Sequence, residues 1–247
     1  MKRDPDPAPQ HEPARAARRP LEPSFRALLR GRFTGLGVVL VVLSFCTTVI
    51  PDHDVREVVI DIAFTILLVF AVHSLRRTMR AVAIILALPA VVGHWTLHLD
   101  APPVPKVAVF VSSLLFLSFL TLVMLHEVLR DQRVNIDTLV GAVCAYFLLG
   151  VTWGSAYALL AIVSPNAFAV SRSLAEVADW QPPKSPLTPL LQYYSFATLS
   201  TVGYGDMSPL TAGARSLSVL ESLVGPLYLA ILISRLVGMH VARTTDR

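Results

Sequence analysis

Seven consecutive residues, Ser-Thr-Val-Gly-Tyr-Gly-Asp at 200–206, interrupt a chain that is otherwise rich in Leu, Val, Ala and Ile. Backbone carbonyls can replace the hydration shell of a cation without a fixed charge that would trap it. For successive carbonyls to face the same way, alternate residues need backbone dihedrals that a Cβ normally forbids, whereas glycine adopts them at little cost. Gly203 and Gly205 have that alternate spacing. The segment therefore predicts a row of carbonyl oxygens from Thr201 to Tyr204, with the Thr201 hydroxyl as a further ligand at its inner end.

The residues just before this segment predict a short helix that ends at it. Thr188 suits the N-cap and Pro189 the first helical position, because proline lacks the N–H that would be unpaired there. A helix from Pro189 to about Leu199 is roughly 16 Å long at about 1.5 Å per residue, which is half of a bilayer. Non-helical backbone at that depth is tolerated only where it lines a protein-walled or water-filled cavity. We expect a re-entrant loop, with the partial negative end of the helix near Ser200 favouring a cation.

The composition of the whole chain indicates a membrane protein, since 54% of its 247 residues are hydrophobic and only 15% are charged. Six apolar blocks are each long enough, at about 1.5 Å per residue, to cross a hydrocarbon core of roughly 30 Å. We expect an all-α membrane protein with six transmembrane helices plus the re-entrant helix and its loop. The blocks cover about 33–50, 58–75, 79–97, 104–125, 138–163 and 213–241.

The basic residues predict the orientation of these helices. With a cytoplasmic N-terminus, the inside segments hold sixteen Lys and Arg residues and the outside segments hold five. This bias favours a multi-pass protein of the cell (plasma) membrane with both termini cytoplasmic. Residues 1–32 are rich in Pro, Ala and Arg and lack an apolar run, so we expect a disordered basic cytoplasmic tail and not a signal peptide. Its basic residues could bind anionic membrane lipids, although four acids in the tail weaken that interaction.

The residues TVGYGD, Thr201 to Asp206, resemble the selectivity filter of the tetrameric potassium-channel family, and the preceding YYSFATLS resembles its pore helix. The resemblance covers residues 138–241, which would form an outer helix, pore helix, filter and inner helix. It implies a pore domain at 131–247 after a four-helix transmembrane domain at 33–130. It also implies a homotetramer, because one chain supplies one filter strand and a closed ring of carbonyls needs four. In that assembly K⁺ would be coordinated by Thr201, Val202, Gly203 and Tyr204, with Gly205 completing the filter and Asp206 at the outer mouth.

Pore-helix side chains are expected to support the filter. Tyr193 and Tyr194 occupy positions where many relatives have Trp, and we expect them to pack behind the filter and brace Tyr204, with Thr198 nearby. The alternative is that both are aromatic anchors at the membrane interface. Ala197 stands where some relatives carry a Glu that pairs with the outer-mouth acid, so that pairing is not expected here.

The last apolar block contains a helix-breaking pair and an acid. Pro226 removes one helical hydrogen bond and disfavours helical geometry at Gly225, so a bend is predicted there. By its spacing from the filter, Gly225 resembles the gating-hinge glycine of similar channels, with a static kink as the alternative. Glu221 should not face lipid. It would either brace the pore helix through Ser195 or Thr198 or line a wet crevice.

The first four blocks lack the pattern of a voltage sensor. Sensors carry Arg or Lys at every third position of the fourth span, whereas the fourth block here has Lys106 alone. Arg76 to Arg80 is interpreted as a short cytoplasmic loop. We expect Asp61, His94 and Lys106 to form an outer polar cluster that neutralises Asp61; the alternative is snorkelling of each side chain at the interface.

These observations favour a potassium-selective channel that conducts K⁺ passively and is not classically voltage-gated. A general monovalent cation channel with the same fold is the nearest alternative, and a nonconducting membrane subunit or sensor is a further one. We expect no catalytic residues, no zinc site, no nucleic-acid partner and no cofactor besides the permeant K⁺. Cys46 and Cys144 lie in apolar blocks and are expected to be small buried hydrophobes. Few residues follow the last block, so we expect no ligand-binding domain there, and gating would come from the filter, the bilayer, the tail or a separate regulatory subunit.

Overall fold

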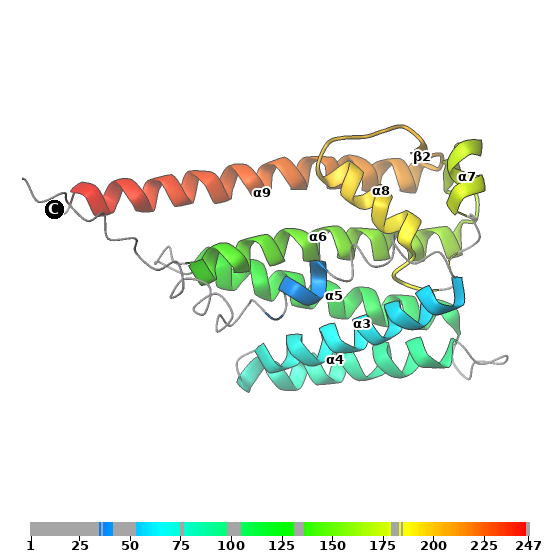
Figure 1. The fold of residues 1–247 in the computed structure, drawn as a ribbon, viewed down its shortest axis with the longest axis horizontal. Coiled ribbons are helices and arrows are strands. Elements are labelled where there is room, and N and C mark those ends of the chain that lie inside the picture. The colour runs from blue at the N-terminus through cyan, green and yellow to red at the C-terminus, as the bar shows by residue number, and fades with distance from the viewer. Residues whose placement is uncertain are drawn as a thin grey trace, which may run out of the picture.

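The computed structural model describes residues 35, 37–41, 53–74, 77–97, 105–130, 136–178, 183 and 185–245. Residues 35 and 37–41 are helical. The predicted tail at 1–32, Cys46, Arg76 and most of the first apolar block lie outside the described residues. The remaining elements, in chain order, are α3 His53–Ser74, α4 Arg77–Thr96, α5 Lys106–Arg130, α6 Ile136–Val163, β1 Phe168–Val170, α7 Arg172–Ala178, α8 Pro189–Leu199, β2 Met207–Pro209 and α9 Ala212–Thr245 (Figure 1).

The helices match the predicted apolar blocks closely. Among the described residues, four helices contain a stretch long and apolar enough to cross a membrane: Met79–Thr96, Lys106–Arg130, Thr138–Val163 and Ala212–Gly238. The second predicted block falls on α3, whose apolar stretch, Val58–Phe70, is shorter. The described chain is therefore that of a mostly helical membrane protein, while six spans remain a prediction.

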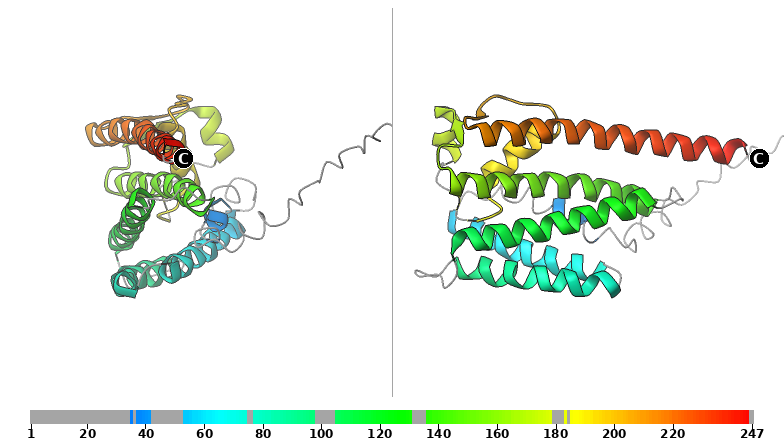
Figure 2. Two further views of the ribbon diagram at one scale, coloured as in Figure 1. Left: turned by 90° about the vertical axis from the view of Figure 1, so that its left-hand side faces the viewer. Right: turned by 180° about the vertical axis from the view of Figure 1, so that it is seen from behind.

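The long helices α4, α5, α6 and α9 run lengthwise beside one another, and α8 is a short tilted helix between α6 and α9 (Figures 1 and 2). Helix α5 packs against both α4 and α6, and α3 packs against α4. In the end-on view of Figure 2, α9 and α4 lie at opposite ends of the molecule. The short helix α8 therefore packs between the long helices α6 and α9.

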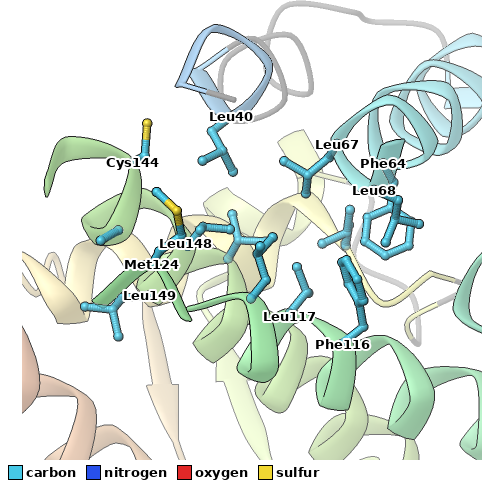
Figure 3. Packing of buried hydrophobic residues seen from close by; sticks show 14 of the residues in the cluster. Leu40, Phe64, Leu67, Leu68, Phe116, Leu117, Met124, Cys144, Leu148 and Leu149 are labelled. Atoms are coloured by element: carbon cyan, nitrogen blue, oxygen red, sulfur yellow. The ribbon is translucent and has the colours of Figure 1, made fainter. Parts of the chain in front are cut away.

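A hydrophobic core joins α3, α5 and α6, as Figure 3 shows. Close packing of such apolar side chains stabilises the contact between helices through dispersion as well as burial. Cys144 is a free cysteine with 1% of its surface exposed, as predicted for a small buried hydrophobe. The labelled members of this core are Leu40, Phe64, Leu67, Leu68, Phe116, Leu117, Met124, Cys144, Leu148 and Leu149.

A two-stranded antiparallel sheet was not predicted from the sequence. Phe168 of β1 pairs with Pro209 of β2, and Val170 pairs with Met207. Each strand has three residues, too few for an alternating pattern to be recognised in the sequence. The sheet connects the chain that leaves α6 to the chain that follows Asp206.

A buried ion-pair contact joins α3 to α4. The Oδ1 atom of Asp61 contacts Nε2 of His94, and the two residues are 2% and 1% exposed. The ring of Phe64 lies over that of His94, with 5.0 Å between centroids. The predicted pairing of Asp61 with His94 is therefore confirmed, and snorkelling of these two side chains is not what the structure has. Lys106, the first residue of α5, is exposed, whereas its two expected partners, Asp61 and His94, are buried.

Two side chains of α9 donate hydrogen bonds to backbone carbonyls of α6 and α5. The Tyr228 hydroxyl donates a hydrogen bond to the Ala142 carbonyl of α6 over 2.6 Å. Nearer the C-terminal end of α9, the guanidinium of Arg235 donates to the Val128 carbonyl near the end of α5. Buried polar groups of this kind are costly unless they are paired, so each contact favours one register of α9 against the bundle.

Candidate functional site

The short helix α8 has the predicted bounds, Pro189–Leu199. Pro189 occupies the first helical turn, and the backbone of Thr188 is extended, with ψ of 120°. The amides of Leu191 and Gln192 donate to the Thr188 carbonyl over 3.1 and 3.0 Å. The Thr188 hydroxyl makes no capping bond and donates instead to the Ser185 carbonyl over 2.7 Å. The backbone and Pro189, rather than a side-chain cap, therefore define where α8 begins.

Two glycines of α6 allow α8 to lie close against it. A Cβ at Gly150 would come within 2.4 Å of the Phe196 ring, and one at Gly154 within 2.6 Å of the Gln192 amide. Small residues four apart let membrane helices approach closely, and residues four apart on α8 fill the space that these glycines leave. This role was not predicted, although the Gly-x-x-x-Gly spacing within an apolar block indicates close helix packing.

Gly225 allows helix α9 to contact the end of α8. A Cβ at Gly225 would lie 1.9 Å from the carbonyl oxygen of Leu199, the last residue of α8. Helix α9 continues through Gly225 and Pro226. The structure thus gives Gly225 a packing role that the sequence analysis did not anticipate, while hinge bending there stays a prediction.

Alternate residues of the segment after α8 have positive φ. The angles are 61° at Thr201, 55° at Gly203 and 77° at Gly205. A Cβ at either glycine would meet nothing within 4 Å, so their backbone angle, and not a lack of space, is what requires glycine. The positive φ of Thr201 was not predicted, and it is a genuine outlier for a β-branched residue. Such strain costs about 1–3 kcal/mol and persists where the surroundings enforce it.

The backbone amides of this segment turn back onto α8. Val202 and Gly203 both donate to the Ala197 carbonyl, over 2.9 and 3.1 Å, and Thr201 donates to the Thr198 carbonyl over 3.0 Å. Among the described residues, none donates a hydrogen bond to the carbonyl oxygens from Thr201 to Tyr204. These oxygens are therefore free to accept a cation, which is the chemistry that a carbonyl-lined ion site requires.

Tyr193 contacts the end of the segment that carries Tyr204 and Asp206. Its hydroxyl donates to Oδ2 of Asp206 over 2.6 Å, and its ring stacks on Tyr204 with 6.1 Å between centroids and 9° between planes. Burial, followed by the hydrogen bond to Asp206, raises the pKa of Tyr193 to about 12. The Asp206 carbonyl accepts from the Ser171 amide over 2.8 Å, beside the β1–β2 pair. The structure thus brings together Tyr193, Tyr204 and Asp206 of the predicted set.

Tyr194 contacts a different set of side chains. Its ring lies 5.1 Å from that of Tyr157 and 5.3 Å from that of Phe168, and its hydroxyl is 2.7 Å from that of Ser218. The Thr198 hydroxyl donates within α8, to the Tyr194 carbonyl over 2.9 Å. Tyr194 therefore contacts α6, β1 and α9, and Thr198 bonds within α8, whereas Tyr193 contacts Tyr204.

Glu221 lies behind α8 with none of its surface exposed. Its Oε2 accepts a hydrogen bond from the Tyr157 hydroxyl over 2.5 Å, and its Oε1 lies 2.5 Å from Ser195 Oγ. Ser195 Oγ is also 2.7 Å from the Gly150 carbonyl. The expected contact of Glu221 with Ser195 is present, and burial rules out a wet crevice within this chain. Tyr157 was missed, although a hydroxyl inside an apolar block requires a partner.

Residues 181–241 match a family model described as an ion channel. The match includes α8, the segment from Thr201 to Asp206 and most of α9. No curated protein and no solved structure matches the chain significantly. The geometry of the free carbonyls and the matched family model together support passive ion movement through a membrane as the activity of residues 181–241.

Proposed function

We propose that this protein is a potassium-selective channel that conducts K⁺ passively, with residues 200–206 as its selectivity filter. The observation that carries the proposal is the alternation of positive φ at Thr201, Gly203 and Gly205 beside carbonyl oxygens that accept no hydrogen bond from the described residues. Carbonyls of such a segment replace the water around a dehydrated cation. K⁺ would be coordinated by Thr201, Val202, Gly203 and Tyr204, and Asp206 would attract cations at the outer mouth.

The proposal includes a homotetramer, because four filter segments are needed to surround one ion. In the single chain Val202 is 52% exposed and Tyr204 is 71% exposed, so this segment has surface available for other copies. Leu220, Leu223 and Leu227 of α9 are also more than half exposed. We propose that the tetramer covers part of these surfaces and that the remainder faces the conduction path or lipid.

Ion flux in vesicles tests the proposal. Purified full-length protein is reconstituted in lipid vesicles, and K⁺ and Na⁺ uptake are compared under the same gradient. Potassium channel function predicts K⁺ uptake that greatly exceeds Na⁺ uptake. Equal uptake of the two ions would indicate a general monovalent cation channel, and a purified tetramer that passes no K⁺ would contradict the channel proposal in favour of a nonconducting subunit.

A further inference from the structure

Glu221 takes part in a set of short oxygen–oxygen contacts. The number of these contacts can be compared with the number of protons that could form hydrogen bonds in them. Each hydrogen bond between two oxygens needs one proton. Three contacts are present: Tyr157 Oη to Glu221 Oε2 at 2.5 Å, Ser195 Oγ to Glu221 Oε1 at 2.5 Å, and Ser195 Oγ to the Gly150 carbonyl at 2.7 Å. All four residues belong to one chain, so the count does not depend on an oligomer.

An ionised Glu221 leaves this set one proton short. The hydroxyls of Tyr157 and Ser195 supply one proton each, while a carbonyl oxygen and an ionised carboxylate supply none. When Glu221 is protonated, its own proton lies between Oε1 and Ser195 Oγ. Ser195 then donates to the Gly150 carbonyl and Tyr157 donates to Oε2, so that every contact is a proper hydrogen bond.

The surroundings of Glu221 also favour a neutral acid. The titratable groups that face it are tyrosine hydroxyls, those of Tyr157 and Tyr146 on α6 and that of Tyr194 on α8. In the described part of the chain, no Lys, Arg or His forms an ion pair with Glu221. Burying an ionised carboxylate without a cation is costly, and such a group becomes neutral instead.

We propose that Glu221 is a protonated carboxylic acid that donates a hydrogen bond to Ser195 and so joins the inner helix α9 to the pore helix α8. Through Ser195 the same chain of hydrogen bonds reaches the Gly150 carbonyl on α6. Glu221 is then a positioning residue, because it acts on the filter only through the helix that precedes it. This role in conduction rests on the proposed channel function, whereas the protonation itself does not.

Infrared spectroscopy of the reconstituted full-length protein at neutral pH tests the protonation directly. The wild type should show the carbonyl stretching band of a carboxylic acid, and Glu221→Gln should lack it. The matched change Glu127→Gln, at a partly exposed acid near the end of α5, should leave the band in place. In the wild type, ¹³C labelling of the glutamate carboxyl groups should shift the same band, which tests the proposal without a variant. A wild-type spectrum without a glutamate acid band would overturn it, whether or not the protein conducts K⁺.

Ion flux tests the positioning role. A Gln amide can donate to Ser195 and accept from Tyr157, so Glu221→Gln keeps all the contacts and K⁺ flux should stay within about twofold of wild type. Glu221→Leu removes both contacts to residue 221, and flux should fall by about tenfold or more. A Glu221→Gln protein that loses as much flux as Glu221→Leu would show that a carboxylate charge, and not a neutral donor, is needed.

Discussion

Two polar regions beside α8 differ in whether their polar atoms form hydrogen bonds within the chain. The proposed filter segment, residues 200–206, is largely exposed, and its carbonyls from Thr201 to Tyr204 accept no hydrogen bond from the described residues. The rear cluster, defined as Tyr157, Tyr194, Ser195, Ser218 and Glu221, is buried, and each of its members has a hydrogen-bond partner. The oxygens proposed to bind an ion therefore accept no hydrogen bond from the described residues, whereas the polar atoms that join α6, α8 and α9 are paired within the chain.

The largest effect on this arrangement is expected from Gly225→Ala. The new Cβ would lie 1.9 Å from the Leu199 carbonyl oxygen, a backbone atom that cannot turn aside. Helix α9 would have to separate from α8, and overpacking of this kind costs about 1–3 kcal/mol. Thermal unfolding in detergent should occur at a lower temperature than in wild type. The control is Gly238→Ala, where a Cβ would meet nothing within 4 Å. Equal stability of the two variants would contradict the close approach of α9 to α8.

Gly203→Ala should affect conduction more than unfolding. Space is available for the Cβ, but φ at residue 203 is 55°. An L-residue in that region costs about 1–2 kcal/mol, so the carbonyls should rotate out of line and K⁺ flux should fall by about tenfold or more. Gly238→Ala again serves as the control, because it adds the same methyl group without a positive φ. Undiminished K⁺ flux through Gly203→Ala would argue against these carbonyls as the ion site.

The adjacent tyrosines allow the two regions to be separated with matched changes. Tyr194→Phe removes the proton donated to the Ser218 oxygen in the rear cluster, which should cost about 1 kcal/mol of stability. Tyr193→Phe removes the bond to Asp206 at the filter but keeps the ring on Tyr204, so it should change K⁺ flux more than the unfolding temperature. Equal changes in K⁺ flux and in unfolding temperature for the two variants would contradict separate roles for Tyr193 and Tyr194.

The smallest effect concerns the pH dependence of the Tyr193 contact. The pKa of Tyr193 is raised from 10.0 to about 12, by burial and then by the bond to Asp206. A raised pKa stabilises the protonated form in the folded state, so this stabilisation is complete below pH 10 and is lost as the pH rises through about 12. The difference in tyrosinate absorbance between wild type and Tyr193→Phe should show this late ionisation. An ionisation midpoint near 10 would indicate that neither the burial of Tyr193 nor its contact with Asp206 is maintained.

Much of the fold could be predicted because its signals are local. Runs of apolar residues located α4, α5, α6 and α9 to within a few residues, and Thr188 with Pro189 located the start of α8. The short β1–β2 pair could not be predicted in this way, because its stability comes from backbone bonds between segments that are far apart in the sequence. The pairing of Asp61 with His94 was predicted from the cost of an unpaired acid in a membrane, and the exposed position of Lys106 was not.

In the candidate site, too, some features could be predicted from the sequence and others could not. The glycines at 203 and 205 made positive φ predictable at those two residues, since that freedom is a property of the residue type, whereas the positive φ of Thr201 was not predictable in this way. Tertiary structure alone decided that Gly225 lies against Leu199, that Gly150 and Gly154 receive the side chains of α8, and that Tyr157 and Ser195 meet at Glu221. Such contacts depend on how the helices are placed against one another. The sequence by itself therefore determined where glycines permit the proposed row of carbonyls, and the packing of α6, α8 and α9 decided what holds that segment in place.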